Sequence, residues 1–358
     1  MKTVVICGYG LAGKIFHGAL IKSVQGFEVI GILTGDSDRT AQAKADFPQA
    51  LVSNNFEELL DLSPDLVVVA GANITHVPQA RAAISRGINV VIDKPIAVDA
   101  STVAELGSLA AAQGVTVLPF QNRRWDSDYL TLKTAVTSGV IGTPHRFESR
   151  LERFRLLPKG GWRDLNDPEA LGGVLYDFAP HIVDQAIDLM GPVVSVDAHA
   201  RTVRETPVSD DDLIILLQHE SGGISYLVGS LAIGLPEPRF TLAGTRGALR
   251  IKALDTQEDH LKLGEIPGPN WGVEPAESTI EIWASDAGGE LSYSTAGFEV
   301  GNWPEYYREV LEFLEDFTAP TVTLDQAIAT MRVMDAARSS AQSGDNVRLI
   351  PPASHQLA

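Results

Sequence analysis

The chain has 358 residues, which is more than one hydrophobic core usually supports, so we expect two domains. Its hydrophobic content of 44% and charged content of 21% are typical of a globular protein, and its net charge of −18 argues against nucleic acid or an anionic membrane as a partner. The lone Cys7 cannot form an internal disulfide, and no apolar run reaches the roughly 18 residues of a membrane span. The first apolar run starts at once and is interrupted by glycines, so we expect no secretory signal and a cytoplasmic protein.

The first third of the chain alternates strand and helix patterns. Short apolar runs that end in glycine or polar residues are each followed by a helical pattern. The predicted strands cover 2–7, 27–34, 65–71, 89–94 and 115–120, and the predicted helices cover 11–24, 39–47, 76–87 and 101–114. This alternation predicts an α/β domain with a doubly wound parallel sheet and right-handed crossovers.

The pattern changes after about residue 121. Longer strand patterns with alternating polarity then follow one another, helices are sparse until the last 60 or so residues, and 219–223 ("HESGG") reads as a hairpin turn. The predicted strands cover 144–156, 193–205, 211–220, 223–232 and 239–244, and the predicted helices cover 303–317 and 324–341. We expect an α+β domain with a large, mostly antiparallel sheet, and we place the domains at 1–121 and 122–358.

The turn after the first strand carries a glycine motif. In "CGYGLAG", Gly8, Gly10 and Gly13 have the spacing G-x-G-x-x-G between a predicted strand and a predicted helix. In that context the glycines let a pyrophosphate approach the backbone N–H groups and the positive end of the helix dipole. We therefore predict a dinucleotide-binding domain.

The end of the second strand distinguishes NADP from NAD. An acidic residue about 20 positions after the glycines would bind the ribose hydroxyl of NAD. Here Thr34 and Gly35 occupy that place, and a hydroxyl, a flexible glycine and the guanidinium of Arg39 suit a 2′-phosphate better. NADP is favoured and NAD stays possible, because Asp36 could turn inward and Arg39 could be a solvated helix residue.

A further unusual stretch is "YDFAPHIVDQ" (176–185). Asp177 and His181 are four residues apart, and Pro180 between them fits only the first turn of a helix, so we expect a helix that begins near Asp177. The glycine pair Gly172-Gly173 precedes it and allows a close approach of backbone or ligand. Local reasoning leaves open whether the acid and the histidine form a site or a surface pair.

Three segments in order resemble one family. They are Gly8–Gly13, "VVIDKPIAVD" (90–99) with Asp93 where the family commonly has Glu, and "GGVLYDFAPH" (172–181). Together they resemble the glucose–fructose oxidoreductase / inositol dehydrogenase / MocA family of sugar and cyclitol dehydrogenases, over nearly the whole chain. The stretches "FHGALI", "QNRRWDSDYLTLK", "GPV" and "EPRF…GTRG" are similar to the branch that contains NADP-dependent scyllo-inositol dehydrogenases. A departure is "AGAN" (70–73), which replaces the family's commoner Thr-Pro-Asn loop.

The resemblance implies an N-terminal Rossmann domain, a C-terminal domain with an open sheet, and a site in the cleft between them. It implies a cofactor site that comprises Gly8, Tyr9, Gly10, Leu11, Ala12, Gly13, Thr34, Gly35, Arg39, Gly71, Asn73, His76, Asp93, Lys94, Pro95 and Asn122. Lys94, Asp177 and His181 are the expected catalytic residues. The expected substrate contacts are Lys94, Arg124, Trp162, Arg163, Asp177 and His181.

Oxidation of a secondary alcohol needs a hydride acceptor at the carbon and a proton acceptor at the hydroxyl. The imidazole of His181 is suited to take and return that proton near neutral pH, and Asp177 could bind a substrate hydroxyl or raise the basicity of His181. The ammonium of Lys94 would stabilise developing alkoxide charge, and Pro95 biases Lys94 toward extended geometry. No metal site is expected, because the histidines are scattered and the lone cysteine lies in a strand.

The function predicted from the sequence is therefore an NAD(P)-dependent dehydrogenase that acts on CH–OH groups of a cyclitol or sugar. Two alternatives keep the same fold: a non-catalytic cofactor-binding regulator, and an NAD-dependent glycoside hydrolase. A small polyol or sugar is the expected substrate, and a homodimer or homotetramer is the expected assembly. The sequence leaves open which hydroxyl is oxidised.

Overall fold

Segments that are far apart in the sequence belong to the same compact unit. The structure is a computed structural model that describes residues 1–158, 160, 171–205, 209–235 and 237–349. The first unit contains Met1–Ser127, Asp255–Glu274 and Val300–Ile328, and the second contains the other described residues. The division of the chain into two domains at residue 121 remains a prediction.

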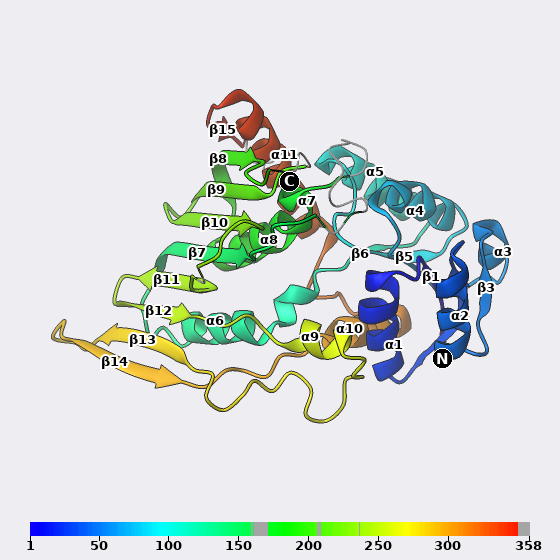
Figure 1. Ribbon diagram of the computed structural model, residues 1–358, viewed down its shortest axis with the longest axis horizontal. Coiled ribbons are helices and arrows are strands. Elements are labelled where there is room, and N and C mark those ends of the chain that lie inside the picture. The colour runs from blue at the N-terminus through cyan, green and yellow to red at the C-terminus, as the bar shows by residue number, and fades with distance from the viewer. Residues whose placement is uncertain (159, 161–170, 206–208, 236, 350–358) are drawn as a thin grey trace, which may run out of the picture. The chain divides into compact units, whose positions relative to one another are not determined.

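The first unit contains a six-stranded parallel sheet with the strand order β3-β2-β1-β4-β5-β6 (Figure 1). Its strands are β1 (Lys2–Cys7), β2 (Phe27–Leu33), β3 (Leu51–Ser53), β4 (Leu66–Val69), β5 (Asn89–Ile92) and β6 (Val117–Pro119). The order reverses between β1 and β4, which are neighbours in register Val4↔Leu66 to Cys7↔Val69. In a doubly wound sheet, ligands bind at the carboxyl ends of the strands at this switch point.

Apolar runs explain the central strands of this sheet. The side chains of Val4–Cys7, Leu66–Val69 and Val90–Ile92 are fully buried, as expected for parallel strands that are covered on both faces. The sequence did not reveal β3 or the short helix α3 (Phe56–Leu60), because β3 has only three, partly exposed residues at the edge of the sheet. The α/β class predicted for this part is confirmed.

Helices of the first unit come from all three of its segments. They are η1 (Leu11–Gly18), α1 (Ala19–Ser23), α2 (Ser37–Asp46), η2 (Asn73–Thr75), α4 (His76–Ser85), α5 (Ala100–Ala112), η3 (Asn122–Trp125), α9 (Gln257–Lys262) and α10 (Pro304–Asp316). The side chains of Tyr306 and Tyr307 in α10, and of Trp303 just before it, belong to the same hydrophobic core cluster as Leu20 and Ile21 of α1. A segment near residue 305 thus completes the core of the N-terminal sheet domain.

The second unit contains a nine-stranded sheet with the order β14-β13-β12-β11-β7-β10-β9-β8-β15 (Figure 1). Its strands are β7 (Pro144–Glu152), β8 (Val193–Arg201), β9 (Asp212–His219), β10 (Ile224–Ser230), β11 (Phe240–Gly244), β12 (Gly247–Ile251), β13 (Ile280–Ser285), β14 (Leu291–Ala296) and β15 (Val347–Arg348). All neighbours are antiparallel except β7 and β10, which confirms the predicted mostly antiparallel sheet. The predicted hairpin joins β9 to β10, with Gly222 at φ +81°.

One face of this sheet is covered by helices and the other is exposed. Along β9 the side chains of Leu213, Ile215 and Leu217 are fully buried, whereas Leu216 and Gln218, on either side of Leu217, are exposed. The helices of this unit are α6 (Ser127–Thr137), α7 (Val174–Asp177) and α8 (Ala179–Met190), and α11 (Leu324–Ser343) ends in it. Helix α8 packs against β7 and β10. No helix in the described ranges is long and apolar enough to cross a membrane.

The helix expected to begin near Asp177 differs from the prediction. Helical structure begins earlier, at Val174, and is interrupted at Phe178, after which α8 begins at Ala179 with Pro180 in its first turn. Proline has no N–H to donate to the carbonyl four residues before it, so the turn that contains it breaks from the preceding one. Asp177 therefore ends α7, and His181 lies in the first turn of α8.

Candidate functional site

The glycine loop after β1 is packed closely against the loop after β4. Gly8 has φ +94°, and a Cβ on it would lie 2.6 Å from the Cα of Gly71 and 2.9 Å from the carbonyl oxygen of Ala70. A Cβ on Gly13 would lie 1.9 Å from the carbonyl oxygen of Gly8. Only glycine fits both positions, so the motif brings the first turn of the helix against the end of the strand.

The helix that follows this loop begins without a side-chain cap. Gly10 is the N-cap of η1 and makes no capping hydrogen bond through a side chain. The first backbone N–H groups of a helix have no partner within the helix, and they favour an anion such as a phosphate. Leu11 is 46% exposed there, whereas the hydroxyl of Tyr9 points into the unit and donates to Oδ2 of Asp46 at 2.8 Å. Burial and the neighbouring Asp46 raise the pKa of the Tyr9 phenol, so the hydroxyl stays protonated.

The residues at the end of β2 have distinct environments. Thr34 is buried, and Gly35 is exposed with open space where a Cβ would lie. Asp36 is the N-cap of α2, and its Oδ1 accepts the backbone N–H of Arg39 at 2.9 Å. The guanidinium of Arg39 lies beside the glycine loop, because a Cβ on Gly10 would be 3.8 Å from its Cζ and from one of its terminal nitrogens.

The loop after β4 lies beside the glycine loop at the switch point of the sheet. A Cβ on Gly71 would lie 2.8 Å from the Oγ1 of Thr75, and Asn73 is 5% exposed in η2. His76 begins α4, and its Nδ1 lies 2.9 Å from the carbonyl oxygen of Pro95, which can only accept. Burial lowers the pKa of His76, so the ring is neutral at neutral pH and carries its proton on Nδ1. His76 therefore fixes the segment that contains Pro95.

The segment Asp93-Lys94-Pro95 follows β5, next to β4 in the sheet. Oδ1 of Asp93 accepts the backbone N–H of Lys94 at 2.8 Å, and the Lys94-Pro95 peptide bond is cis. Burial alone would raise the pKa of Asp93, but the neighbouring His17, Lys94 and His76 lower it below its ordinary value, so the carboxylate is ionised. Lys94 thus follows a partly buried, negatively charged residue at the end of β5.

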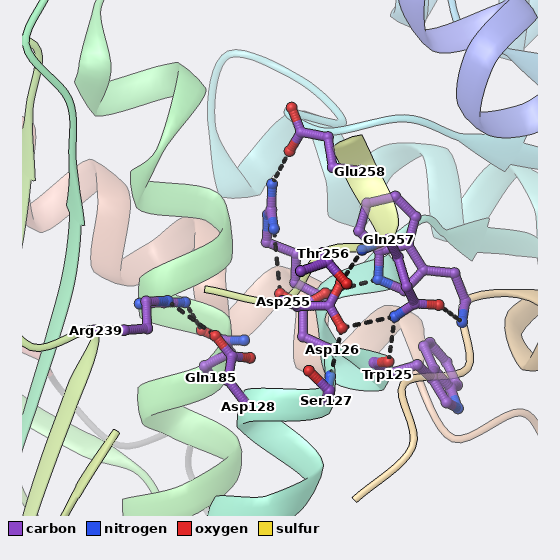
Figure 2. Close-up of polar contacts among 12 residues, drawn as sticks. Trp125, Asp126, Ser127, Asp128, Gln185, Arg239, Asp255, Thr256, Gln257 and Glu258 are labelled. Atoms are coloured by element: carbon purple, nitrogen blue, oxygen red, sulfur yellow. Dashed lines mark hydrogen bonds and ion pairs between the residues drawn. The ribbon is translucent and has the colours of Figure 1, made fainter. Parts of the chain in front are cut away.

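Asn122 and Arg124 lie in η3, which a polar network anchors to the rest of the first unit. Both side chains are buried, and a terminal nitrogen of Arg124 donates to Oε1 of Gln326 at 3.2 Å. Figure 2 shows the anchor: Nε2 of Gln257 donates to the carbonyl oxygen of Trp125 at 3.0 Å. Oε1 of the same side chain accepts the indole N–H of Trp271 at 2.7 Å and the backbone N–H of Trp303 at 2.8 Å.

A salt-bridge network extends this anchor. Arg123 is 8% exposed and pairs with Asp126 at 3.2 Å and with Glu258 at 2.5 Å (Figure 2). The indole N–H of Trp303 donates to the other oxygen of Asp126 at 2.7 Å. The position of η3 is therefore set by residues about 130 and 180 positions further along the chain.

In the second unit, Asp210 holds the two residues that follow the glycine pair Gly172-Gly173 and precede Asp177 and His181. Oδ2 of Asp210 accepts the backbone N–H of Leu175 at 2.8 Å, and its carbonyl oxygen accepts that of Val174 at 3.0 Å. Gly173 has φ +87°, and a Cβ on it would lie 2.1 Å from Oδ1 of Asp210, so no other residue fits there. Burial raises the pKa of Asp210 to about 6. His181 is 6% exposed, and Asp177 is partly exposed.

The same unit contains a second buried charge cluster, which the sequence did not reveal. Arg239 is 3% exposed, and its guanidinium contacts Asp128 at 3.4 Å and Oε1 of Gln185 at 2.9 Å (Figure 2). It also donates to Oγ of Ser149 at 2.7 Å. Because these partners come from α6, α8 and β7, the cluster fixes α8 on the sheet. The cluster thereby helps to set the position of the helix that carries His181.

Some predicted site residues cannot be compared with the structure. Trp162 and Arg163 lie outside the described residues. Within the described ranges, no group of three or more His, Cys, Asp or Glu side chains could hold a metal ion. The sequence gave no reason to assign a role to His17, Tyr307 or Asp210. In the structure His17 contacts Asp93, and it also contacts Tyr307, which lies 290 positions further along the chain. The one feature of the sequence that could have pointed to His17 is its place as a histidine within the apolar helical pattern of "FHGALI".

The parallel sheet with its glycine turn at the switch point defines a dinucleotide-binding domain of the Rossmann type, and a mixed sheet follows it in the chain. Comparison with known proteins agrees. Residues 2–120 match the domain described as "Oxidoreductase family, NAD-binding Rossmann fold", and residues 133–349 match "Oxidoreductase family, C-terminal alpha/beta domain". The chain belongs to the Gfo/Idh/MocA oxidoreductase family, as the resemblance implied.

Similar proteins cover nearly the whole chain. The oxidoreductase YdgJ of Escherichia coli is 35% identical over 341 residues, which are 95% of this chain and 96% of YdgJ. The scyllo-inositol 2-dehydrogenase (NADP(+)) IolW of Bacillus subtilis is 29% identical over 349 residues, or 97% of this chain and 95% of IolW. The solved structure of the Bacillus subtilis oxidoreductase yvaA has a TM-score of 0.92 at 28% identity and covers 98% of both chains.

Proposed function

We propose that this protein is an NADP-dependent dehydrogenase that transfers a hydride between the nicotinamide and a secondary alcohol of a cyclitol or sugar. The observation that carries the cofactor choice is the position of Arg39 beside Gly10 of the glycine loop. The Arg39 side chain faces the loop where the phosphates of a dinucleotide bind in this fold. The similarity to IolW, whose name specifies NADP(+) and scyllo-inositol, supports the same assignment.

The environment of Asp36 supports NADP over NAD. An acid that binds the ribose of NAD needs its oxygens turned toward the adenosine, but Oδ1 of Asp36 caps α2 by accepting the N–H of Arg39. Thr34 and Gly35 carry no charge that would repel a 2′-phosphate, and there is open space where a Cβ on Gly35 would lie. A dianionic phosphate would receive charge-assisted hydrogen bonds from Arg39.

The residues of the first unit fit such a dinucleotide. Gly8 and Gly13 admit no side chain, and the uncapped N-terminus of η1 offers backbone N–H groups to the pyrophosphate. Asn73, His76, Asp93, Lys94, Pro95 and Asn122 are the other residues that we assign to cofactor binding. When bound, the nicotinamide supplies the hydride chemistry.

The proton transfer is assigned to residues of this chain. We assign to His181 the role of general base, which takes the proton of the substrate hydroxyl and returns it in the reverse direction. Lys94 donates a hydrogen bond to the same oxygen and stabilises its developing negative charge, and Asp177 binds a second substrate hydroxyl. Arg124, Trp162 and Arg163 are assigned to the substrate as further polar contacts.

Steady-state kinetics tests this proposal. Absorbance at 340 nm, followed with NADP and with NAD against cyclitols, aldoses and 1,5-anhydrosugars, should show turnover and a higher kcat/KM with NADP. Tight NADP binding without turnover would instead identify a regulator, and activity on glycosides with cofactor recycling would identify a hydrolase. A preference of the wild type for NAD would remove Arg39 from the cofactor site.

A variant pair separates the role of Arg39 from the effect of charge alone. Arg39→Ala should weaken NADP binding by about 1.5–3 kcal/mol and leave NAD binding unchanged, because only NADP has the phosphate that the guanidinium binds. Lys44→Ala, which removes another exposed cation of α2, is the matched control and should change neither affinity. Equal losses for both cofactors in Arg39→Ala would contradict the assignment.

A further inference from the structure

A buried polar chain in the first unit leads from α10 to the strand end that carries Lys94. The ring of His17 in η1 is fully buried, and its Nδ1 lies 2.7 Å from the hydroxyl of Tyr307 in α10. Its Nε2 lies 3.9 Å from Oδ2 of Asp93, an ion-pair distance rather than a hydrogen bond. Oδ1 of Asp93 accepts the backbone N–H of Lys94 at 2.8 Å. Three segments that are distant in sequence thus meet at the residue before Lys94.

The direction of donation along this chain follows from the chemistry of its ends. The ionised carboxylate of Asp93 can only accept, so the proton of a neutral His17 ring belongs on Nε2, which faces it. Nδ1 then has a free lone pair, which accepts from the hydroxyl of Tyr307. Burial raises the pKa of Tyr307 well above its ordinary value, so that hydroxyl keeps its proton. Nε2 of His17 has no hydrogen-bond partner within the described residues, so Asp93 is the acceptor toward which it points.

Packing alone does not require polar groups at these two positions. The ring of His17 lies 4.1 Å from that of Phe120, and the ring of Tyr307 makes edge contacts with Phe27 at 5.9 Å. Phenylalanine at either position would keep comparable aromatic contacts and would avoid the desolvation of buried nitrogens and oxygens. The polar atoms form a continuous path that ends on Asp93, which indicates a role in holding that carboxylate.

We propose that His17 and Tyr307 are positioning residues for Lys94: together they orient the carboxylate of Asp93, which in turn holds the backbone of Lys94. His76 holds the same segment from its other end, through its Nδ1–H bond to the carbonyl oxygen of Pro95. The inference rests on the proposed function only for the catalytic role of Lys94. The chain of polar contacts itself is a property of the protein without substrate.

The first test is the exchange rate of the Lys94 backbone amide, measured by hydrogen–deuterium exchange on the peptide that spans residues 90–97 of the protein without substrate. Tyr307→Phe removes one hydroxyl and keeps the ring, and His17→Phe removes both ring nitrogens. Each should speed the exchange of the Lys94 amide, by about tenfold or more for His17→Phe, because Asp93 loses the group that orients it. This readout does not depend on the proposed activity.

Catalysis provides the second readout. Tyr307→Phe should lower kcat by about 3- to 10-fold, the loss expected for one hydrogen bond, with KM for the cofactor within about twofold of wild type. His17→Gln should keep more activity than His17→Phe, because an amide can also accept from Tyr307 and donate to Asp93. Tyr129→Phe is the matched control: its hydroxyl is equally buried and donates to Asp188 at 2.6 Å in the other unit. It should change neither readout.

The two readouts separate the two proposals. Faster Lys94 exchange in the variants together with an inactive wild type would overturn the proposed function and leave the positioning chain standing. Wild-type exchange and wild-type kcat in Tyr307→Phe would overturn the positioning chain, whatever the fate of His17→Phe as a folded protein. A ¹⁵N-histidine spectrum that shows His17 neutral and protonated on Nδ1 would overturn it as well.

Discussion

Asp210→Asn should change how the stability of the protein depends on pH. Asp210 holds the N-terminus of α7 by accepting the N–H of Leu175, and burial raises its pKa to about 6 from an ordinary value of 3.8. A folded-state pKa above the unfolded one means that the folded protein binds this proton more tightly. The stabilisation is therefore fully present below about pH 4 and is lost as the pH rises through 6.

The structure sets the size of the effect. A difference of about two pH units between the folded and unfolded pKa corresponds to about 3 kcal/mol of unfolding free energy. Asparagine keeps an oxygen that can accept the N–H of Leu175 but never ionises. Relative to wild type, Asp210→Asn should therefore gain up to about 3 kcal/mol between pH 4 and pH 7.5, or roughly 6–12 °C in Tm for a unit of this size.

Thermal and urea unfolding of both proteins across pH 4 to 7.5 measures this difference. Because all other titrating groups are shared, they cancel when the two curves are subtracted. Asp286→Asn is the control for the loss of one carboxylate: Asp286 is exposed and accepts the backbone N–H groups of Gly288 and Glu290. Parallel curves for wild type and Asp210→Asn would refute the reasoning, because they would show that Asp210 titrates alike in the folded and unfolded chains.

Three further predictions concern the site and the assembly. His181→Ala should cut turnover by roughly 10²-fold or more, while the affinity for NADPH, measured by fluorescence, stays near wild type. Lys94→Ala should have a similar effect on turnover. Lys94→Arg should not restore turnover, because a planar guanidinium cannot replace a compact ammonium. Wild-type turnover in either alanine variant would remove that residue from the mechanism. Thr34→Asp should reverse the cofactor preference, because a carboxylate accepts from the ribose of NAD and repels the phosphate of NADP; an unchanged kcat/KM ratio would contradict the site. The uncovered face of the nine-stranded sheet carries exposed Leu216 and Ile224, so we expect a dimer or tetramer in sedimentation, and a monomer at all concentrations would contradict this.

The class of fold could be predicted from the sequence because its signals are local. Apolar runs such as those of β1, β4 and β5 alternate with helical patterns, and the glycine triplet stands between a strand and a helix. The strands that escaped prediction are β3, β12, β13, β14 and β15. β3 and β15 have only three and two residues, and β14 is exposed along its whole length, so neither burial nor alternation marks these three. Their pairing with longer neighbours decides that they are strands.

Part of the candidate cofactor site could also be predicted from the sequence, because its signals are local as well. Their spacing between a predicted strand and a predicted helix identified Gly8, Gly10 and Gly13, and the type of residue at Thr34 and Arg39 favoured NADP. The sequence could not decide between Asp36 as a ribose ligand and Asp36 as a helix cap, since both fit an exposed acid before a helix. The structure shows the cap, and it places the Arg39 guanidinium beside Gly10.

Other features depended on contacts between distant segments, and only the tertiary structure could supply them. His17 meets Tyr307 across 290 positions, Arg123 meets Glu258 across 135, and Asp210 meets the N–H of Leu175 across 35. A buried polar side chain must find a partner wherever the fold brings one within reach, so its partner is set by the packing of whole segments and not by neighbouring residues. The sequence by itself determined the class of fold and predicted where a dinucleotide would bind, because backbone geometry and hydrophobic periodicity are local. The environment of Asp93, Asp210 and Lys94 was decided by the tertiary structure, because burial and charge depend on contacts between distant segments.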